Sequence, residues 1–415
     1  MSRRTRSEQA VARPGWPQAL VTALGTLVAM AVVAALGLWA AGATDLPDNA
    51  FPRVVAATVV TAVGGSLELS GDAGELAETR AGLTVVPLSV TLVGALSLAA
   101  GFLRPLRRRA VVGGGELAGW AGRIAVPWLL ALTALALAAR QTFAVSLGEG
   151  VLADLGDVFD VAPRVGFTTD VPLSVISGLV WLGAVLVVAV LVSGEPPLRA
   201  RLLRLRESVR PAAYAMVVLL LVYVALGVVI ALVVAVTRGP AAETLAVILL
   251  GMPNLVWLTL TIGLGATWHG RVQGPFGLPM PHVLDEVLRT GDVSALNLGT
   301  LSRYDGRVWW LVAVDAVLLS AAAYVMAARS PAGTRVWRHA VRMAAALALT
   351  VLMVCLTGRV SAHYGLSLLV FGDLGGGLSG ELFLDPEIWP ALGLAVLWGL
   401  ATGLLGGLMA RWTRR

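Results

Sequence analysis

The chain has 415 residues, of which 57% are hydrophobic and 13% charged, and its formal net charge is +6. A soluble globular domain carries about 25% charged residues, so this composition excludes a protein solvated by water alone. All 31 basic residues are arginine, which excludes the lysine-dependent sites of P-loop nucleotide hydrolases, pyridoxal enzymes and kinases. The arginine-only usage is typical of a GC-rich, actinobacterial-type coding bias.

Residue counts and spacings also argue against most catalytic chemistry. The single cysteine, Cys355, permits no internal disulfide. The four histidines are scattered without metal-ligand spacing, and no nucleophile-elbow, Walker or Rossmann pattern occurs. We therefore expect no enzyme activity, no cofactor, no metal and no nucleic-acid partner. The basic residues are interpreted below as markers of membrane topology.

Eight apolar runs predict transmembrane helices, because about 20 helical residues cross a hydrocarbon core of about 30 Å. The first run follows a basic N-terminus and is longer than the apolar region of a signal peptide, so we expect an uncleaved first span. The lipid bilayer is thus the expected partner of an all-α, polytopic membrane protein. The predicted spans are 19–43, 82–103, 124–140, 171–193, 211–236, 308–328, 343–359 and 388–410.

Two weaker apolar stretches accompany the eight runs. Residues 54–66 are too few to cross the membrane, and residues 244–268 are interrupted by Gly251 and Pro253. Proline inside a helix removes a hydrogen bond and clashes with the preceding turn. We expect both stretches to re-enter from the outer side of the membrane, with Pro253 and Asn254 at the tip of the second. An ordinary proline kink in a full ninth span is the alternative.

The distribution of arginine predicts the orientation of the spans. If both weak stretches return to the side from which they entered, five segments of the chain lie on the same side of the membrane. Together these segments hold 21 of the arginines and only four acidic residues. The positive-inside rule then places both termini in the cytoplasm of a bacterial plasma membrane. The five cytoplasmic segments are 1–18, 104–123, 194–210, 329–342 and 411–415.

Similar motifs in the two halves of the chain predict a parallel internal duplication, as in some transporter folds. The windows RQTFAVSLGEGVLADLG and RVSAHYGLSLLVFGDLG begin at Arg140 and Arg359, and each ends in a D-L-G triplet, at Asp154 and Asp373. The predicted organisation is a basic N-terminus (1–18), two four-span halves (19–193 and 211–410), a basic linker (194–210) and a cytoplasmic tail (411–415).

Arg140 and Arg359 are expected near the outer membrane boundary. Either they extend to the lipid headgroups, or they form an outward-facing cationic site that pairs with Asp154 and Asp373 or holds an anionic ligand. Asp315 is the one acid well inside a predicted span. It either handles a proton or cation, or makes a packing hydrogen bond to a neighbouring helix.

Four segments carry a resemblance to a known family: FPRVVAATVVTAVGGSLELSGDAG, VVPLSVTLVGALSLAAGFLRPLRRR, LLGMPNLVW and GLPMPHVLDEVLRTGD. They resemble the streptophobe family, which comprises very hydrophobic membrane proteins of Streptomyces and relatives. The resemblance covers most of the chain but includes no catalytic motif. It implies a bacterial plasma-membrane protein of unassigned activity and transfers no functional residue. Within the last segment, PHVLDEVLR predicts a short amphipathic helix.

Two functions of different classes fit these observations. A permease or channel-like protein would use a cavity between the halves, lined by Asp315 and by Pro253 and Asn254. A non-transporting structural or regulatory protein of the cell envelope would act through a protein partner. The two are separated by whether Asp315 and the tip of the second weak stretch face one shared cavity. The sequence names neither a solute nor a partner.

Overall fold

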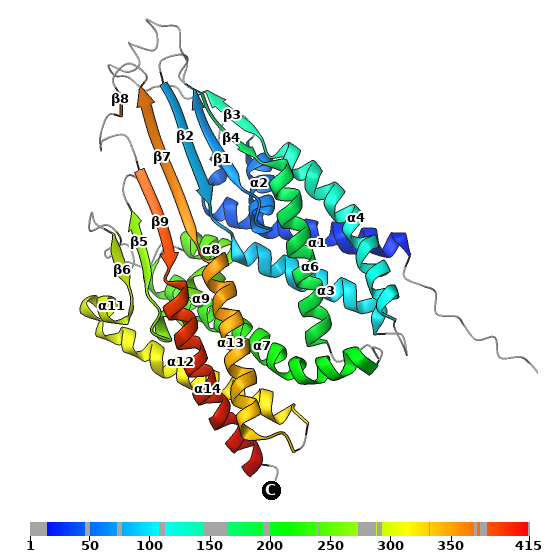
Figure 1. Cartoon of the computed structure of the whole chain (residues 1–415). Helices are drawn as coiled ribbons and strands as arrows, with labels where there is room; N and C mark the ends of the chain where they lie inside the picture. The colour runs from blue at the N-terminus through cyan, green and yellow to red at the C-terminus, as the bar shows by residue number, and fades with distance from the viewer. Residues whose placement is uncertain are drawn as a thin grey trace, which may run out of the picture.

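The fold is a bundle of apolar helices that carries a β-sheet at one end (Figure 1). The computed structural model describes residues 15–45, 50–72, 77–107, 113–144, 164–193, 200–239, 241–272, 288, 293–331, 333–368, 372–373 and 380–413. In this part of the chain eight helices are long and apolar enough to cross a membrane. They are α1 (Trp16–Ala40), α3 (Leu88–Leu106), α4 (Gly114–Ala138), α6 (Val171–Val192), α7 (Ala200–Arg238), α12 (Trp310–Ala328), α13 (Val336–Thr357) and α14 (Ile388–Trp412).

Each predicted span corresponds to one of these helices, so the polytopic α-helical membrane class is confirmed. The main difference lies at α7. This helix begins at Ala200, within the stretch predicted as a basic linker, and its apolar part covers Val209–Thr237. The arginines of that stretch therefore extend the helix beyond its apolar part.

The two weak apolar stretches form short helices. Residues Phe51–Ala62 form α2, whose 12 residues rise only about 18 Å. The second stretch forms α8 (Ala241–Leu250) and α9 (Met252–Gly263), which meet at a bend of 75°. The predicted break at Gly251 and Pro253 is thus present. The remaining short helices with bounds in the described part of the chain are η1 (Ala43–Asp45), α11 (Leu298–Tyr304) and η2 (Gly306–Trp309).

The described residues form a nine-stranded antiparallel sheet, which the sequence did not predict, at one end of the bundle (Figure 1). Its strand order is β3-β4-β1-β2-β7-β9-β5-β6, and β8 pairs with β7. The pairing of β2 with β7 joins the two halves of the chain over eight residue pairs. The strands are β1 (Leu67–Asp72), β2 (Ala77–Thr84), β3 (Gln141–Ala144), β4 (Arg164–Thr169), β5 (Trp268–Val272), β6 (Ser294–Leu296), β7 (Val360–Leu368), β8 (Gly372–Asp373) and β9 (Gly380–Pro386).

Corresponding elements of the two halves are arranged alike. The order β3-β4-β1-β2 in the first half matches β7-β9-β5-β6 in the second. Within the first half α1 contacts α2, α3 and α4, and within the second α7 contacts α9, α12 and α13. Helices α2 and α9 both have 12 residues and are followed by glycines with positive φ, Gly64 (+89°) and Gly265 (+97°). These similarities support the predicted duplication, but a common origin of the halves stays a prediction.

Each half also has its own apolar core. One core is formed by α1, α2, α3, α4 and α6, and the other by α7, α9, α12, α13, α14 and the strands next to them. In the second half, glycines of α14 permit close helix packing. A Cβ at Gly399 would lie 2.4 Å from Ala344 Cα, and a Cβ at Gly403 would lie 2.7 Å from Ala340 Cα. Small residues at helix interfaces are typical of membrane bundles, where they bring backbones together.

The sheet has one polar face and one apolar face. Alternate residues of a strand lie on opposite faces, and the register aligns the strands. Glu68, Thr84, Thr168, Ser361 and Asp385 fall on one face and are exposed. On the other face, next to the bundle, the buried residues are Gln141, Phe167, Thr169, Trp268, Val272, Leu296 and Leu382. The apolar face thus continues the core of the bundle.

Candidate functional site at the junction of the two halves

The bend between α8 and α9 is stabilised by a serine from the first half of the chain. In a straight helix the Met252 N–H would donate to the Ile248 carbonyl, four residues earlier. At the bend, Ser89 Oγ accepts a hydrogen bond from Met252 N (3.2 Å) and donates one to Ile248 O (2.8 Å). Backbone groups at membrane depth need partners inside the protein. Ser89 therefore satisfies the two groups that the bend separates.

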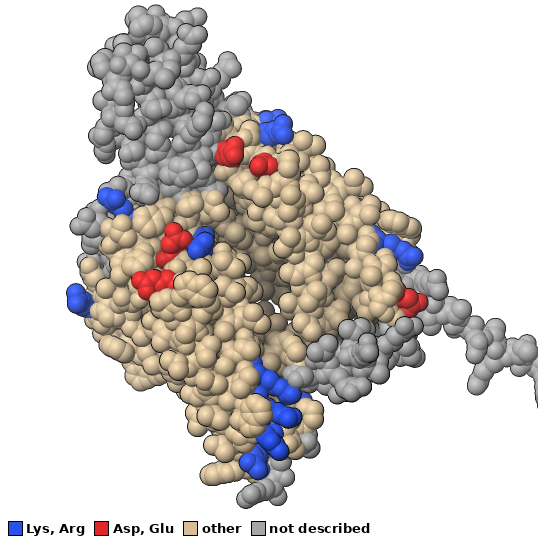
Figure 2. All heavy atoms as spheres, viewed as in Figure 1, with Lys and Arg blue, Asp and Glu red and all other residues tan. Residues whose placement is uncertain are grey.

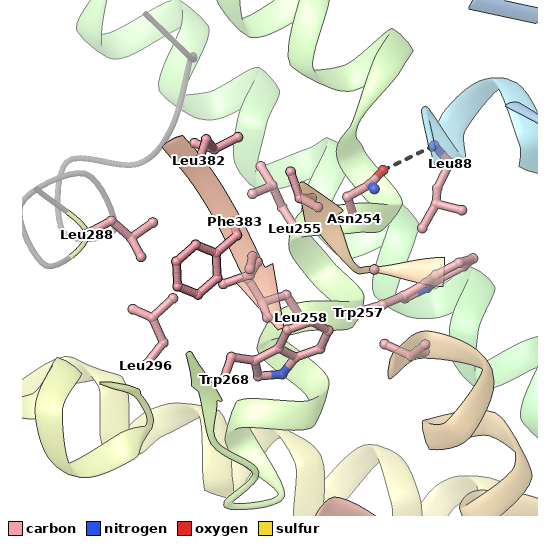
Figure 3. A pocket seen from close by; sticks show the side chains of 14 residues that line it. Leu88, Asn254, Leu255, Trp257, Leu258, Trp268, Leu288, Leu296, Leu382 and Phe383 are labelled. Carbon is pink, nitrogen blue, oxygen red and sulfur yellow. Dashed lines mark hydrogen bonds between the residues drawn. The ribbon is translucent and has the colours of Figure 1, made fainter. Parts of the chain in front are cut away.

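Asn254, at the predicted tip, makes a second connection between the halves. Its Oδ1 accepts a hydrogen bond from Leu88 N (3.1 Å), the dashed line in Figure 3, and its Nδ2 donates one to Val86 O (2.9 Å). These two backbone groups lie on either side of Pro87, which has no N–H of its own. One side-chain amide thus links the start of α9 to the junction of β2 and α3.

An apolar cavity of about 130 Å³ lies beside Asn254, between α9, the end of α13 and the membrane-proximal part of the sheet (Figure 3). The amide of Asn254 already pairs with backbone groups. Apolar side chains supply nearly all of the lining. The lining thus suits a short hydrocarbon group and offers nothing to an ion. It comprises Leu88, Asn254, Leu255, Trp257, Leu258, Trp268, Leu288, Leu296, Val354, Gly358, Val360, Leu382, Phe383 and Leu384.

Asp315 on α12 is buried, with 1% of its surface exposed, and it packs against two other helices. The Tyr223 hydroxyl of α7 donates a hydrogen bond to Asp315 Oδ1. Oδ2 lies against Gly263, the last residue of α9, where an added Cβ would come within 2.2 Å of that oxygen. Among the described residues Oδ2 has no hydrogen-bond partner. The last turn of α9 presents the negative end of a helix dipole, which disfavours an ionised carboxylate there.

Asp315 and the tip of α9 therefore do not share the cavity. Asn254 lines it, whereas Pro253 is buried outside the lining and Asp315 packs elsewhere, at the other end of α9. The three residues belong to one junction but not to one solute-sized space. The packing alternative for Asp315 matches its contacts with Tyr223 and Gly263.

Arg140 and Arg359 occupy corresponding positions, each directly before the strand that follows a span. Arg140 is exposed between α4 and β3, and Arg359 is exposed between α13 and β7. Arg359 Nε lies 3.4 Å from Asp385 Oδ1, so its described partner differs from the predicted Asp373. Asp373 lies in β8, but its side chain is outside the described part of the structure, as is all of Asp154.

Sequence reasoning missed a second polar pair near Arg359. His269 Nε2 of β5 lies 2.7 Å from Glu387 Oε1, at the residue that separates β9 from α14. The register places His269 opposite Asp385, so both pairs lie at the base of the sheet. The two pairs join residues more than 20 positions apart, and only knowledge of the strand pairing would have indicated them.

Metal and thiol chemistry find no support in the described residues. No group of three or more histidine, cysteine, aspartate or glutamate side chains there could hold a metal ion, and Cys355 is buried. The predicted amphipathic helix PHVLDEVLR lies outside the described residues except for Leu288, which lines the cavity. Comparisons with protein-family models, curated proteins and solved structures find no match to the chain.

Proposed function

We propose that this membrane protein transports no solute and instead binds a protein partner through the polar face of its sheet, on the outer side of a bacterial plasma membrane. Both termini then lie in the cytoplasm, as the arginine distribution predicts. The proposal includes membership of the streptophobe family, which rests on the sequence segments quoted above. The observation that carries it is the two-faced sheet built jointly by both halves.

The composition of the polar face supports binding to a protein. Beyond the exposed residues already named, the register pairs His269 and Arg271 of β5 with Asp385 and Phe383 of β9, on the same face. Charges of both signs on one face favour specific recognition of a complementary partner rather than a single small molecule.

Short connections between the strands and the spans would couple a partner bound to the sheet mechanically to the helix bundle. Only Asp170 separates β4 from α6, and only Glu387 separates β9 from α14. The Asp170 side chain also accepts a hydrogen bond from Leu173 N and caps α6. Connections this short leave the strands little freedom to move independently of the helices. A partner on the sheet would therefore be held rigidly against the membrane bundle.

The permease stays the second candidate because of two features. The 75° bend between α8 and α9 resembles the broken helices that carry substrate sites in transporters. The buried Oδ2 of Asp315 also lacks a hydrogen-bond partner among the described residues. Against transport, the cavity is small and apolar, and Asp315 lies outside it.

Photo-crosslinking in intact cells tests the partner. A photoreactive amino acid would replace Thr84, Thr168 or Ser361, which are exposed on three strands of the polar face. The matched control is Val180 of α6, which is 66% exposed on an apolar helix and would face lipid. We expect the same protein adduct from all three sheet positions and none from Val180. Absence of a shared adduct from the sheet positions would refute partner binding.

A transport assay tests the second candidate independently. The wild-type protein and Asp315→Asn would be reconstituted in vesicles and compared in proton-coupled uptake of a broad solute panel. We expect both to give background traces. Uptake by the wild type that is lost in Asp315→Asn would instead support the permease.

A further inference from the structure

Five arginines gather at the end of the second half that lies away from the sheet. Arg329 follows α12, and Arg335 directly precedes α13. Arg338 lies in the first turn of α13 and Arg342 one turn further along, while Arg411 lies in the last turn of α14. We call these residues the arginine face. Figure 2 shows arginine side chains gathered at the lower end of this view, with no acidic side chain among them.

Close packing of the three helices brings these arginines to one level. Gly406 of α14 packs against Ala323 of α12, where an added Cβ would lie 2.5 Å from the Ala323 carbonyl carbon. Gly407 of α14 approaches Val336 of α13, with 3.1 Å between its Cβ position and Val336 Cγ1. One turn beyond these contacts are the ends of α12 and α14. The arginine face is therefore one surface built from three helix termini.

The chain supplies few anions to this surface. The sequence has no aspartate or glutamate between Asp315 and Asp373, and none after Glu387. Glu207 of α7 is an acid of a neighbouring helix, but its side chain lies outside the described part. Among the described residues none of the five arginines forms an ion pair, and Arg342 Nη1 is buried without a hydrogen-bond partner.

The helix dipole adds to the positive charge of the arginine face. The first turn of α13 contains no acidic residue, and no side chain caps its N-terminus. A helix N-terminus carries a partial positive charge and free N–H groups, which favour a bound anion. Arginines at this position increase the local positive potential. An anion from outside the chain would reduce the repulsion between the arginines and the repulsion between the arginines and the helix N-terminus.

Aromatic residues place the arginine face at the depth of lipid headgroups. Trp337 and Trp412 are 54% and 80% exposed beside the arginines, and exposed tryptophans mark the membrane–water boundary. Arg338 lies over the Trp337 ring at 5.6 Å, and Arg329 lies over the Tyr214 ring at 3.6 Å. The guanidinium groups are thus level with the phosphates of the surrounding lipids.

We propose that the arginine face is a binding site for the phosphate of an anionic phospholipid. A guanidinium group forms paired hydrogen bonds to phosphate oxygens, so arginine suits this ligand better than a point charge does. Arg335 and Arg338 would contact the phosphate at the N-terminus of α13, and Arg411 would approach from α14. This site is independent of the partner proposed for the sheet.

Lipid titration of the purified full-length protein tests this site, with bound lipid counted by native mass spectrometry. The ligands are phosphatidylglycerol, phosphatidylcholine and free glycerol phosphate. The test variant is Arg335→Gln with Arg338→Gln. Its control, Arg303→Gln with Arg307→Gln, removes two exposed arginines before α12 and changes the net charge equally. Arg411→Gln provides a second test should the double variant not fold.

We expect the wild type and the control to prefer phosphatidylglycerol over phosphatidylcholine. One arginine near a lipid surface contributes about a fivefold change in affinity, so the double variant should bind phosphatidylglycerol about 25-fold more weakly. Arg411→Gln should bind it about fivefold more weakly. Equal binding of both lipids, or equal losses in the test and control variants, would overturn the proposal. So would free glycerol phosphate that binds as tightly as phosphatidylglycerol.

Discussion

The link that Asn254 makes between the two halves leads to a quantitative prediction. Asn254→Ala removes hydrogen bonds to Leu88 N and Val86 O, and Leu88 is 3% exposed. A buried polar group left without a partner costs about 1–3 kcal/mol. Hydrogen bonds between helices in bilayers contribute about 0.6 kcal/mol each on average. We therefore expect the free energy of unfolding to fall by at least about 1 kcal/mol, and by up to about 6 kcal/mol if both groups stay dry.

Two measurements check this prediction. Denaturant unfolding in detergent gives the loss of stability, and hydrogen exchange reports whether the Leu88 amide becomes unprotected. Asn297→Ala is the matched control, because Asn297 Oδ1 caps α11 by accepting from Thr300 N (2.9 Å) and touches neither half-to-half contact. The control should lose about 1 kcal/mol of helix capping while Leu88 stays protected. Unchanged stability together with an unchanged Leu88 exchange rate in Asn254→Ala would refute the role assigned to this amide.

Three further sets of substitutions test other contacts by unfolding in detergent. Gly399→Ala should lower the free energy of unfolding by about 1–3 kcal/mol because its Cβ would clash with α13. The control Gly393→Ala, which has no atom within 4 Å of the new Cβ, should be neutral or stabilising. Equal effects of the two substitutions would contradict the close packing of α14. Gly64→Ala and Gly265→Ala should each lower the free energy of unfolding by about 1–2 kcal/mol because both glycines have positive φ. A large loss at one site alone would argue against equivalent turns in the two halves. Asp315→Asn should keep the free energy of unfolding within about 1 kcal/mol of the wild type. Asp315→Leu should lower it by about 1–3 kcal/mol because the Tyr223 hydroxyl is left unpaired. A larger loss in Asp315→Asn than in Asp315→Leu would show that the negative charge matters.

The spans were predictable because each depends on local composition alone. An uncharged run of about 20 apolar residues specifies a transmembrane helix whatever the rest of the chain does. The interruption by Gly251 and Pro253 was equally local, and it appears as the 75° bend. Helix ends were less certain, as at α7, because arginines after Ala200 continue the helix outside its apolar part.

The sheet could not be predicted in the same way, because its stability comes from distant pairings. The strand sequence LELSGD alternates only weakly, and its partners include Arg164–Thr169 of β4, nearly 100 residues later. Glycine within the strands also weakens their β-propensity. The windows after Arg140 and Arg359 were recognised as similar, but not as strands.

The site was predictable in its residues but not in its contacts. Composition singles out Asn254 and Asp315 as polar groups within apolar stretches; the hydrogen bond of Asn254 is partly buried and that of Asp315 is buried. Their partners, Leu88 and Tyr223, belong to other helices, so no spacing along the chain could identify them. The role of Ser89 could not be predicted, because serine is common in apolar helices and its hydrogen bonds depend on the bend between α8 and α9.

The pairing of β2 with β7 has a consequence for how the chain assembles during synthesis. Thr84 of β2 pairs with Ser361 of β7, so the edge of β2 lacks its partner until nearly 280 further residues have been made. During that time six more spans, which are α3, α4, α6, α7, α12 and α13, must enter the membrane. An unpaired strand edge is a template for wrong pairing. The slowest and most error-prone stage of biogenesis should therefore be the pairing of β2 with β7. A chain truncated before Val360 should be inserted in the membrane but prone to aggregate.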